Sequence, residues 1–148
     1  MRKLLLLIVG FAVVSCSSKE ELPQRETNSS FKKVYEFSEM ALLMEKMYSE
    51  LEKQRPNIME GKSMGEFPKE FPKIHTAKLT PGFERTDEFT RFADLYLQQV
   101  ELLYNSKPED SKRVEYYNNA VKACISCHKS DAGCMGPVSR IGKLLIEN

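Results

Sequence analysis

The first half of the chain carries a helical pattern of hydrophobic residues. Between Phe31 and Leu51 apolar side chains recur at steps of three and four residues, and charged residues fill most of the positions between them. This spacing places the apolar residues on one face of a helix that packs against a core. We expect the helix to begin near Ser29 or Ser30, either of which can cap it, and to end before Pro56, because a proline disfavours helical backbone in the residue before it. The apolar face consists of Phe31, Val34, Phe37, Met40, Ala41, Met44, Met47, Tyr48 and Leu51.

Two further helical patterns follow in the second half of the chain, joined by a tight turn. The first predicts a helix from a Thr86 cap to about Asn105, with acidic residues in its first turn, where the helix dipole favours negative charge. The second starts at Pro108, whose missing amide hydrogen suits the first helical position. The turn is so short that the two helices must be antiparallel neighbours. The inner face of the second helix carries Val114, Tyr117, Val121 and Cys124.

The segment between these patterns, residues 57–85, is interrupted by glycines and prolines and predicts an irregular connection. A stretch of this length without structure is rare inside a domain, so we expect at least one short helix in it, with Phe67, Phe71 and Ile74 pointing inward. A short amphipathic tail around Leu144 ends the chain. The sequence therefore predicts an all-α fold, an up-and-down helical bundle with one short or irregular helix and a C-terminal extension.

The first residues have the form of a bacterial export signal. Two basic residues precede a short apolar run, which ends in Val-Val-Ser-Cys at Cys16 and resembles a lipobox. We expect residues 1–15 to be removed as a lipoprotein signal peptide and Cys16 to be lipidated. Residues 16–30 then form a polar, flexible tether, and residues 31–148 form the folded domain. An ordinary cleaved signal with an incidental Cys16 is the alternative.

These features predict a location in the bacterial cell envelope, on the periplasmic side of a membrane that the lipid on Cys16 anchors; exposure on the cell surface stays open. The chain has 22 basic and 21 acidic side chains, so its charge attracts neither nucleic acid nor an anionic lipid surface. The acyl chains on Cys16 would therefore have to hold the protein at the membrane.

The chemistry of the chain is concentrated in residues 124–128, which read Cys-Ile-Ser-Cys-His and match C-x-x-C-H, the attachment pattern of c-type haem. On a helix these positions share one face, so two thiols can bond to two vinyl groups while His128 meets the iron. We expect one covalent haem c on Cys124 and Cys127, with His128 as proximal ligand. A structural zinc site of these three residues and Cys134 is an alternative. A redox Cys-x-x-Cys is less favoured, because no strand pattern precedes it.

A helical chain of this size with C-x-x-C-H at the end of its last long helix resembles the cytochrome c prime family of four-helix-bundle cytochromes. The resemblance covers roughly residues 31–129, and the irregular middle segment departs from the family's regular second helix. In that family the first helix meets the far face of the haem, and low-spin members place a methionine there. The resemblance implies Met44 as the second iron ligand. Met40, His75 or no ligand are the alternatives, and a methionine stripe is also ordinary core packing.

The tail after the motif also resembles an extension of small Bacteroidetes haem lipoproteins. It contains Cys134, which the haem motif leaves over. This thiol either packs under the haem edge, ligates iron or pairs between two chains, in which case the protein is a homodimer.

Together these expectations favour an electron carrier and not an enzyme. A Met/His pair leaves no open site on the iron and raises its potential, which suits one-electron transfer with redox partner proteins of the cell envelope. The gas-binding members of the family imply the alternative, a five-coordinate iron that binds nitric oxide. Catalysis such as peroxide reduction ranks last, because no histidine or arginine is placed by the pattern as a distal acid or base.

Overall fold

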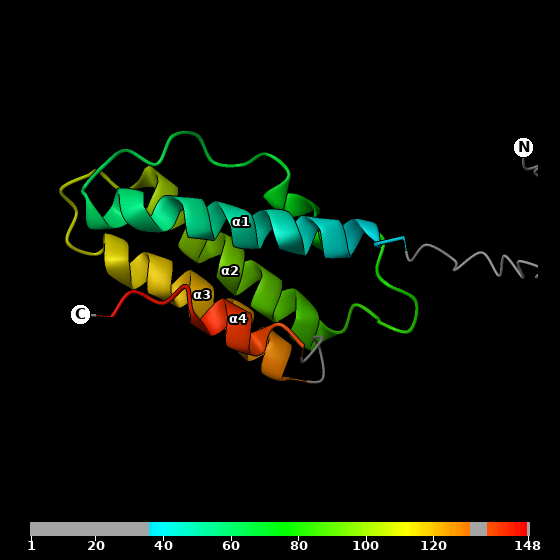
Figure 1. The fold of residues 1–148 in the computed structure, drawn as a ribbon. Helices are drawn as coiled ribbons and strands as arrows, with labels where there is room; N and C mark the ends of the chain where they lie inside the picture. The colour runs from blue at the N-terminus through cyan, green and yellow to red at the C-terminus, as the bar shows by residue number, and fades with distance from the viewer. Residues whose placement is uncertain (1–35, 131–135, 148) are drawn as a thin grey trace, which may run out of the picture. The chain divides into compact units, whose positions relative to one another are not determined.

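The computed structural model describes residues 36–130 and 136–147, and this part of the chain is helical without any strand (Figure 1). Three long helices, α1 (Glu39–Met59), α2 (Asp87–Asn105) and α3 (Arg113–Lys129), form the body. A 3₁₀ helix, η1 (Phe71–His75), lies in the connection between α1 and α2, and a short helix, α4 (Val138–Gly142), follows α3. The predicted all-α bundle with one short helix and a C-terminal extension is confirmed.

The connection between α1 and α2 runs back along α1. Near the end of α1, Gln54 Nε2 donates to the carbonyl of Met64 (3.0 Å), and at its start the amide of Met40 donates to the carbonyl of Lys78 (3.0 Å). Helix α2 therefore begins at the end of the molecule where α1 begins, and α3 returns antiparallel to both (Figure 1). η1 contacts both α1 and α2 and takes the place of a regular second helix.

Helix α1 begins later than its hydrophobic pattern predicts. Ser38 is the cap, since its Oγ accepts the amide of Ala41 (3.0 Å). Residues 36–38 are not helical, and Phe37 is 62% exposed, so the prediction of one continuous helix from Ser29 or Ser30 is wrong at this point. The residues before 36 lie outside the described part of the chain.

The predicted end of α1 before Pro56 is also wrong, because the helix continues through Pro56 to Met59. Gln54 and Ile58 on either side of the proline are only 2% and 6% exposed. The amide of Glu60 donates to the carbonyl of Pro56 (2.9 Å) and closes the last turn. Burial of this turn thus outweighs the helix hydrogen bond that a proline cannot donate.

Helix α2 has the predicted bounds, whereas α3 starts five residues after Pro108. Thr86 Oγ1 accepts the amide of Phe89 (3.1 Å), as expected of a cap. Before α3, Asp110 Oδ1 accepts the amide of Lys112 (2.8 Å) and holds a turn instead of a helix. The side chain of Arg113 is 2% exposed and donates to the carbonyls of Pro108 and Lys62, which fixes the start of α3 there.

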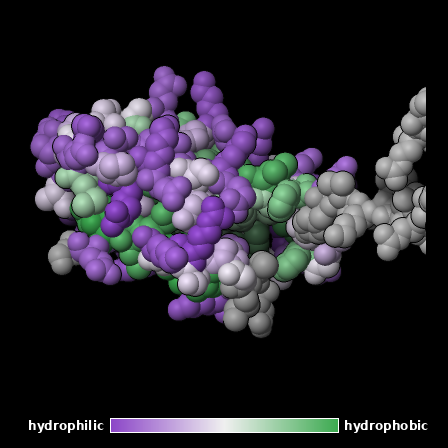
Figure 2. Space-filling view, viewed as in Figure 1, coloured by the Kyte–Doolittle hydropathy of each residue, from purple (hydrophilic) through white to green (hydrophobic). Residues whose placement is uncertain are grey.

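The core lies between α1, α2, α3 and η1. Phe71 and Ile74 of η1 are buried as predicted, and Phe67 is half-buried with its ring edge-on to Tyr104 (centroids 5.8 Å apart). Tyr117, fully buried on α3, donates its hydroxyl hydrogen to the carbonyl of Leu51 on α1 (3.1 Å). Hydrophilic side chains cover most of the face shown in Figure 2. No helix among residues 36–130 and 136–147 is long and apolar enough to cross a membrane.

A polar cluster joins α1, α2 and the connection at the end of the bundle away from the C-x-x-C-H motif. Glu50 Oε1 accepts from the hydroxyl of Tyr104 (2.7 Å) and from Gln54 Nε2 (2.7 Å). Because Gln54 also donates to the connection, this cluster links three segments. It holds the end of α1 beside α2, where the helices have few direct contacts.

Candidate functional site

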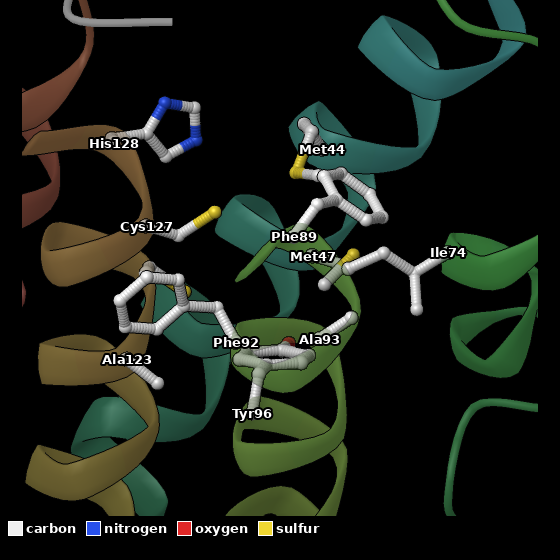
Figure 3. Close-up of a pocket in the computed structure, with 11 residues that line it drawn as sticks. Met44, Met47, Ile74, Phe89, Phe92, Ala93, Tyr96, Ala123, Cys127 and His128 are labelled. Atoms are coloured by element: carbon white, nitrogen blue, oxygen red, sulfur yellow. The ribbon is translucent and has the colours of Figure 1, made fainter. Parts of the chain in front are cut away.

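Helix α3 brings the three residues of the haem motif to one cavity. Cys124, Cys127 and His128 all line a cavity of about 30 Å³ between α1, α2 and α3 (Figure 3). Both cysteines are free thiols. The other walls are almost entirely apolar, which suits the faces of a porphyrin. They are formed by Ile74 of η1, Phe89, Phe92, Ala93 and Tyr96 of α2, and Ala123 of α3.

Helix α1 supplies the opposite wall through Met44 and Met47 (Figure 3). Both methionines also line a second cavity, of about 70 Å³, that borders Cys124 and His128. Met44, the residue that the family resemblance implies as a ligand, is thus brought to the motif. Met47 is a site residue that sequence reasoning assigned to packing alone, although its place three residues after Met44 put it on the same helix face.

The structure does not bring the two other ligand candidates to the motif. Met40 is buried in the core at 6% exposure and lines neither of the two cavities. His75 also lines neither cavity, and its Nε2 lies 3.2 Å from Oδ1 of Asp94 on α2. Cys16 and Cys134 lie outside the described residues.

The extension after the motif covers the second cavity. Pro137, Arg140, Ile141 and Leu144 line it. The guanidinium of Arg140 lies 3.8 Å from the centre of the Tyr48 ring, and its Nη1 donates to both carboxylate oxygens of Glu45 (2.8 and 3.0 Å). α4 and α1 therefore meet over the side of the site that faces away from α2.

The extension is held to α3 as well. Asn118 Nδ2 donates to the carbonyl of Ile146 (2.9 Å), and the amide of Ile146 donates to Asn118 Oδ1 (2.9 Å). Arg55 of α1 donates to the carbonyl of Leu145 (3.4 Å). The end of the chain is therefore tied to both helices that carry the candidate ligands.

The two thiols are protonated near neutral pH. Burial raises the pKa of Cys124 to about 12, and repulsion from the Cys127 thiolate adds to the shift. Burial, followed by repulsion from Glu88, also raises the pKa of Cys127. Reactive redox cysteines have a lowered thiol pKa, so these two thiols lack that property. A zinc ion would have to displace their protons, because zinc binds thiolates. Within the described ranges no group of three or more His, Cys, Asp or Glu side chains is placed to hold a metal ion.

The donor set fits a c-type haem, and the helices must separate to admit one. Two free thiols, an imidazole and an opposing methionine are the groups that such a haem uses. The cavities of about 30 and 70 Å³ are much smaller than the roughly 300–1,000 Å³ of cofactor sites in general. Binding therefore requires the elements around these cavities to move apart. The methionines that line these cavities are flexible side chains that can repack against a new surface.

Comparisons with family models, with curated proteins and with solved structures found no match for this chain. The assignment of the site therefore depends on the chain's own residues and their placement.

Proposed function

We propose that this chain is a monohaem c-type cytochrome that carries single electrons in the bacterial cell envelope. Cys124 and Cys127 hold the haem covalently, His128 is the proximal ligand and Met44 the distal one. The observation that carries the proposal is the gathering of Cys124, Cys127 and His128 at one cavity whose opposite wall is made of methionines. In this proposal the protein acts as an electron carrier and not as an enzyme.

The haem, when bound, supplies an iron that exchanges one electron between its ferric and ferrous forms. The two thioether bonds keep it on the chain, which matters outside the cytoplasm, where lost haem is not replaced. A thioether ligand opposite an imidazole raises the potential and leaves no site for a substrate. Apolar walls from α2 and η1 would exclude water from the haem, and α4 would cover the other side of the site.

The membrane attachment belongs to the same proposal. Residues 1–15 act as a signal peptide, and lipidated Cys16 anchors the mature protein through the tether 16–30. The folded domain then faces redox partner proteins of the envelope. Its nearly balanced charge gives those encounters little long-range electrostatic steering, so recognition depends on short-range contacts.

The deciding experiment is a haem-stained denaturing gel, with the mass of the mature protein and a reduced-minus-oxidised spectrum. We expect haem to stay on the chain after denaturation, one tetrapyrrole of added mass and a sharp low-spin spectrum. The variant Cys124→Ala, Cys127→Ala is the control and should lack both stain and added mass. A wild-type mass of polypeptide plus acyl groups alone would reject the proposal. Immediate, stoichiometric binding of carbon monoxide by the ferrous protein would favour the five-coordinate gas binder instead.

A further inference from the structure

Tyr96 of α2 is buried without a partner for its hydroxyl. It is 2% exposed, and its hydroxyl makes no hydrogen bond to any group of residues 36–130 and 136–147. A buried hydroxyl left unpaired destabilises the folded state, so each such group in a native protein calls for an explanation. Arg55 and Arg113 also have a buried, unpaired Nε, but other nitrogens of each guanidinium are bonded. Tyr96 has no second polar atom in its side chain.

Other tyrosines of this fold have partners. Tyr117 is 0% exposed, and its hydroxyl donates to the carbonyl of Leu51 (3.1 Å). Tyr104 donates to Glu50 (2.7 Å). The bundle therefore does satisfy tyrosine hydroxyls in its interior, and Tyr96 departs from a pattern that the same helices follow elsewhere.

The Tyr96 side chain points from α2 into the cavity that holds Cys124, Cys127 and His128 (Figure 3). The Phe71 ring packs against it, with centroids 6.1 Å apart. Burial raises the pKa of Tyr96 well above its ordinary value. The group is therefore a neutral hydroxyl that can donate one hydrogen bond into an otherwise apolar space.

We propose that the Tyr96 hydroxyl donates a hydrogen bond to an oxygen acceptor that enters the cavity with the bound haem. This inference rests on the proposed function. The acceptor is the carboxylate of a haem propionate, because the two iron ligands of the proposed function leave no position for a further molecule. Tyr96 is then a cofactor-binding residue, and the cost of its unpaired hydroxyl is recovered when the site is filled.

The test compares Tyr96→Phe with Tyr117→Phe in the haem-loaded protein and in the Cys124→Ala, Cys127→Ala background. In the loaded protein Tyr96→Phe should raise the unfolding equilibrium constant roughly fivefold, as expected for one lost hydrogen bond. In the background without haem it should lower this constant, because an unpaired hydroxyl is removed. Tyr117→Phe should raise it in both. If the double cysteine variant does not fold, wild-type chain produced without haem attachment replaces it.

Two further readouts test the identity of the acceptor. With a propionate, Tyr96→Phe shifts the pH dependence of the midpoint potential and leaves nitric oxide affinity unchanged. A severalfold lower nitric oxide affinity with an unchanged pH dependence would overturn the propionate as acceptor and would reject Met44 as the distal ligand, because it requires a ligand on the iron. The same stability change in both backgrounds, with neither readout altered, would overturn the inference while leaving the haem assignment intact. Absence of covalent haem from the wild-type protein would instead reject the proposed function, and this inference with it.

Discussion

Met44 of α1 and His128 of α3 line the same two cavities, each from its own side of the gap between the two helices. They are 84 positions apart in the sequence, and the antiparallel course of α1 and α3 brings them together. Met47 accompanies Met44 at both cavities. Met44 and His128 are therefore the side chains of α1 and α3 that would hold the iron of the proposed haem from the two sides of this gap.

Replacement of Met44 by alanine should convert the haem-loaded protein from low spin to high spin. The iron loses its second protein ligand, so the ferrous form should also bind carbon monoxide. Visible spectra of both oxidation states, with and without carbon monoxide, measure the change. Met47→Ala is the matched variant on the same helix face and should keep the low-spin spectrum.

The variant Met40→Ala controls for damage to the core. It should lower the free energy of unfolding by about 2–5 kcal/mol, as such truncations do, and leave the spectrum unchanged. A high-spin spectrum for Met47→Ala, with a low-spin spectrum for Met44→Ala, would assign Met47 as the ligand. Low-spin spectra for both variants would count against Met44 and Met47 as ligands, and a wild-type protein that is high spin from the start would favour the gas binder.

The variant Glu50→Gln should destabilise the bundle at neutral pH and have less effect in acid. Burial raises the pKa of Glu50, but its hydrogen bonds from Gln54, Tyr104 and Lys53 lower it more, so the folded-state pKa lies below the ordinary value. The charged form therefore stabilises the fold above the unfolded-state pKa of about 4.3, and this contribution is lost as pH falls through the folded-state pKa. We expect a loss of about 1–3 kcal/mol at pH 7.

Urea unfolding of both proteins from pH 7 to pH 3 measures this loss, which should shrink below about pH 4.3 as wild-type Glu50 takes up its proton. Glu52→Gln is the control, because Glu52 is exposed and the hydrogen bond that its side chain accepts from Tyr48 is long (3.5 Å). A constant difference across the whole range would show that the charge of Glu50 does not stabilise the cluster.

The variant Asn118→Ala should release the C-terminal extension. It removes both hydrogen bonds to Ile146 and leaves that residue's amide and carbonyl without this partner, so we expect a loss of about 1–3 kcal/mol. Limited proteolysis followed by mass analysis should show faster cleavage after residue 142. Asn119→Ala, which removes one long bond to Gln99 (3.4 Å), is the control and should change neither quantity by much. Equal cleavage of both variants would mean that Asn118 does not hold the extension.

Sequence reasoning located the features that depend on neighbouring residues. The Thr86 cap bonds to an amide three residues away, and the thiols and imidazole of the motif are spaced by one helical turn. Both relationships are visible in a short stretch of sequence. The inward residues of the middle segment, Phe71 and Ile74, were likewise found from their apolar character between turn residues.

The features that sequence reasoning missed depend on residues that are distant in the sequence. The last turn of α1 stays helical after Pro56 because Gln54 donates a hydrogen bond to the connection. Helix α3 starts at Arg113 because that side chain donates a hydrogen bond to the carbonyl of Lys62. Hydrophobic spacing also continues upstream of Ser38 to Phe37, which is exposed, so the periodicity alone could not show where α1 begins. Whether Met47 borders the motif depends on the relative position of α1 and α3, which spacing within one helix does not determine.

Helices α2 and α3 are adjacent in the sequence and share the most extensive interface of the bundle, whereas α1 joins them by long-range contacts. Contacts between near neighbours in sequence form sooner than those that close long loops, so the α2 and α3 hairpin can form before α1 arrives. If haem is attached as proposed, the thiols of α3 would then be accessible before α1 packs against the hairpin, and α1 would cover the site in the last step of assembly.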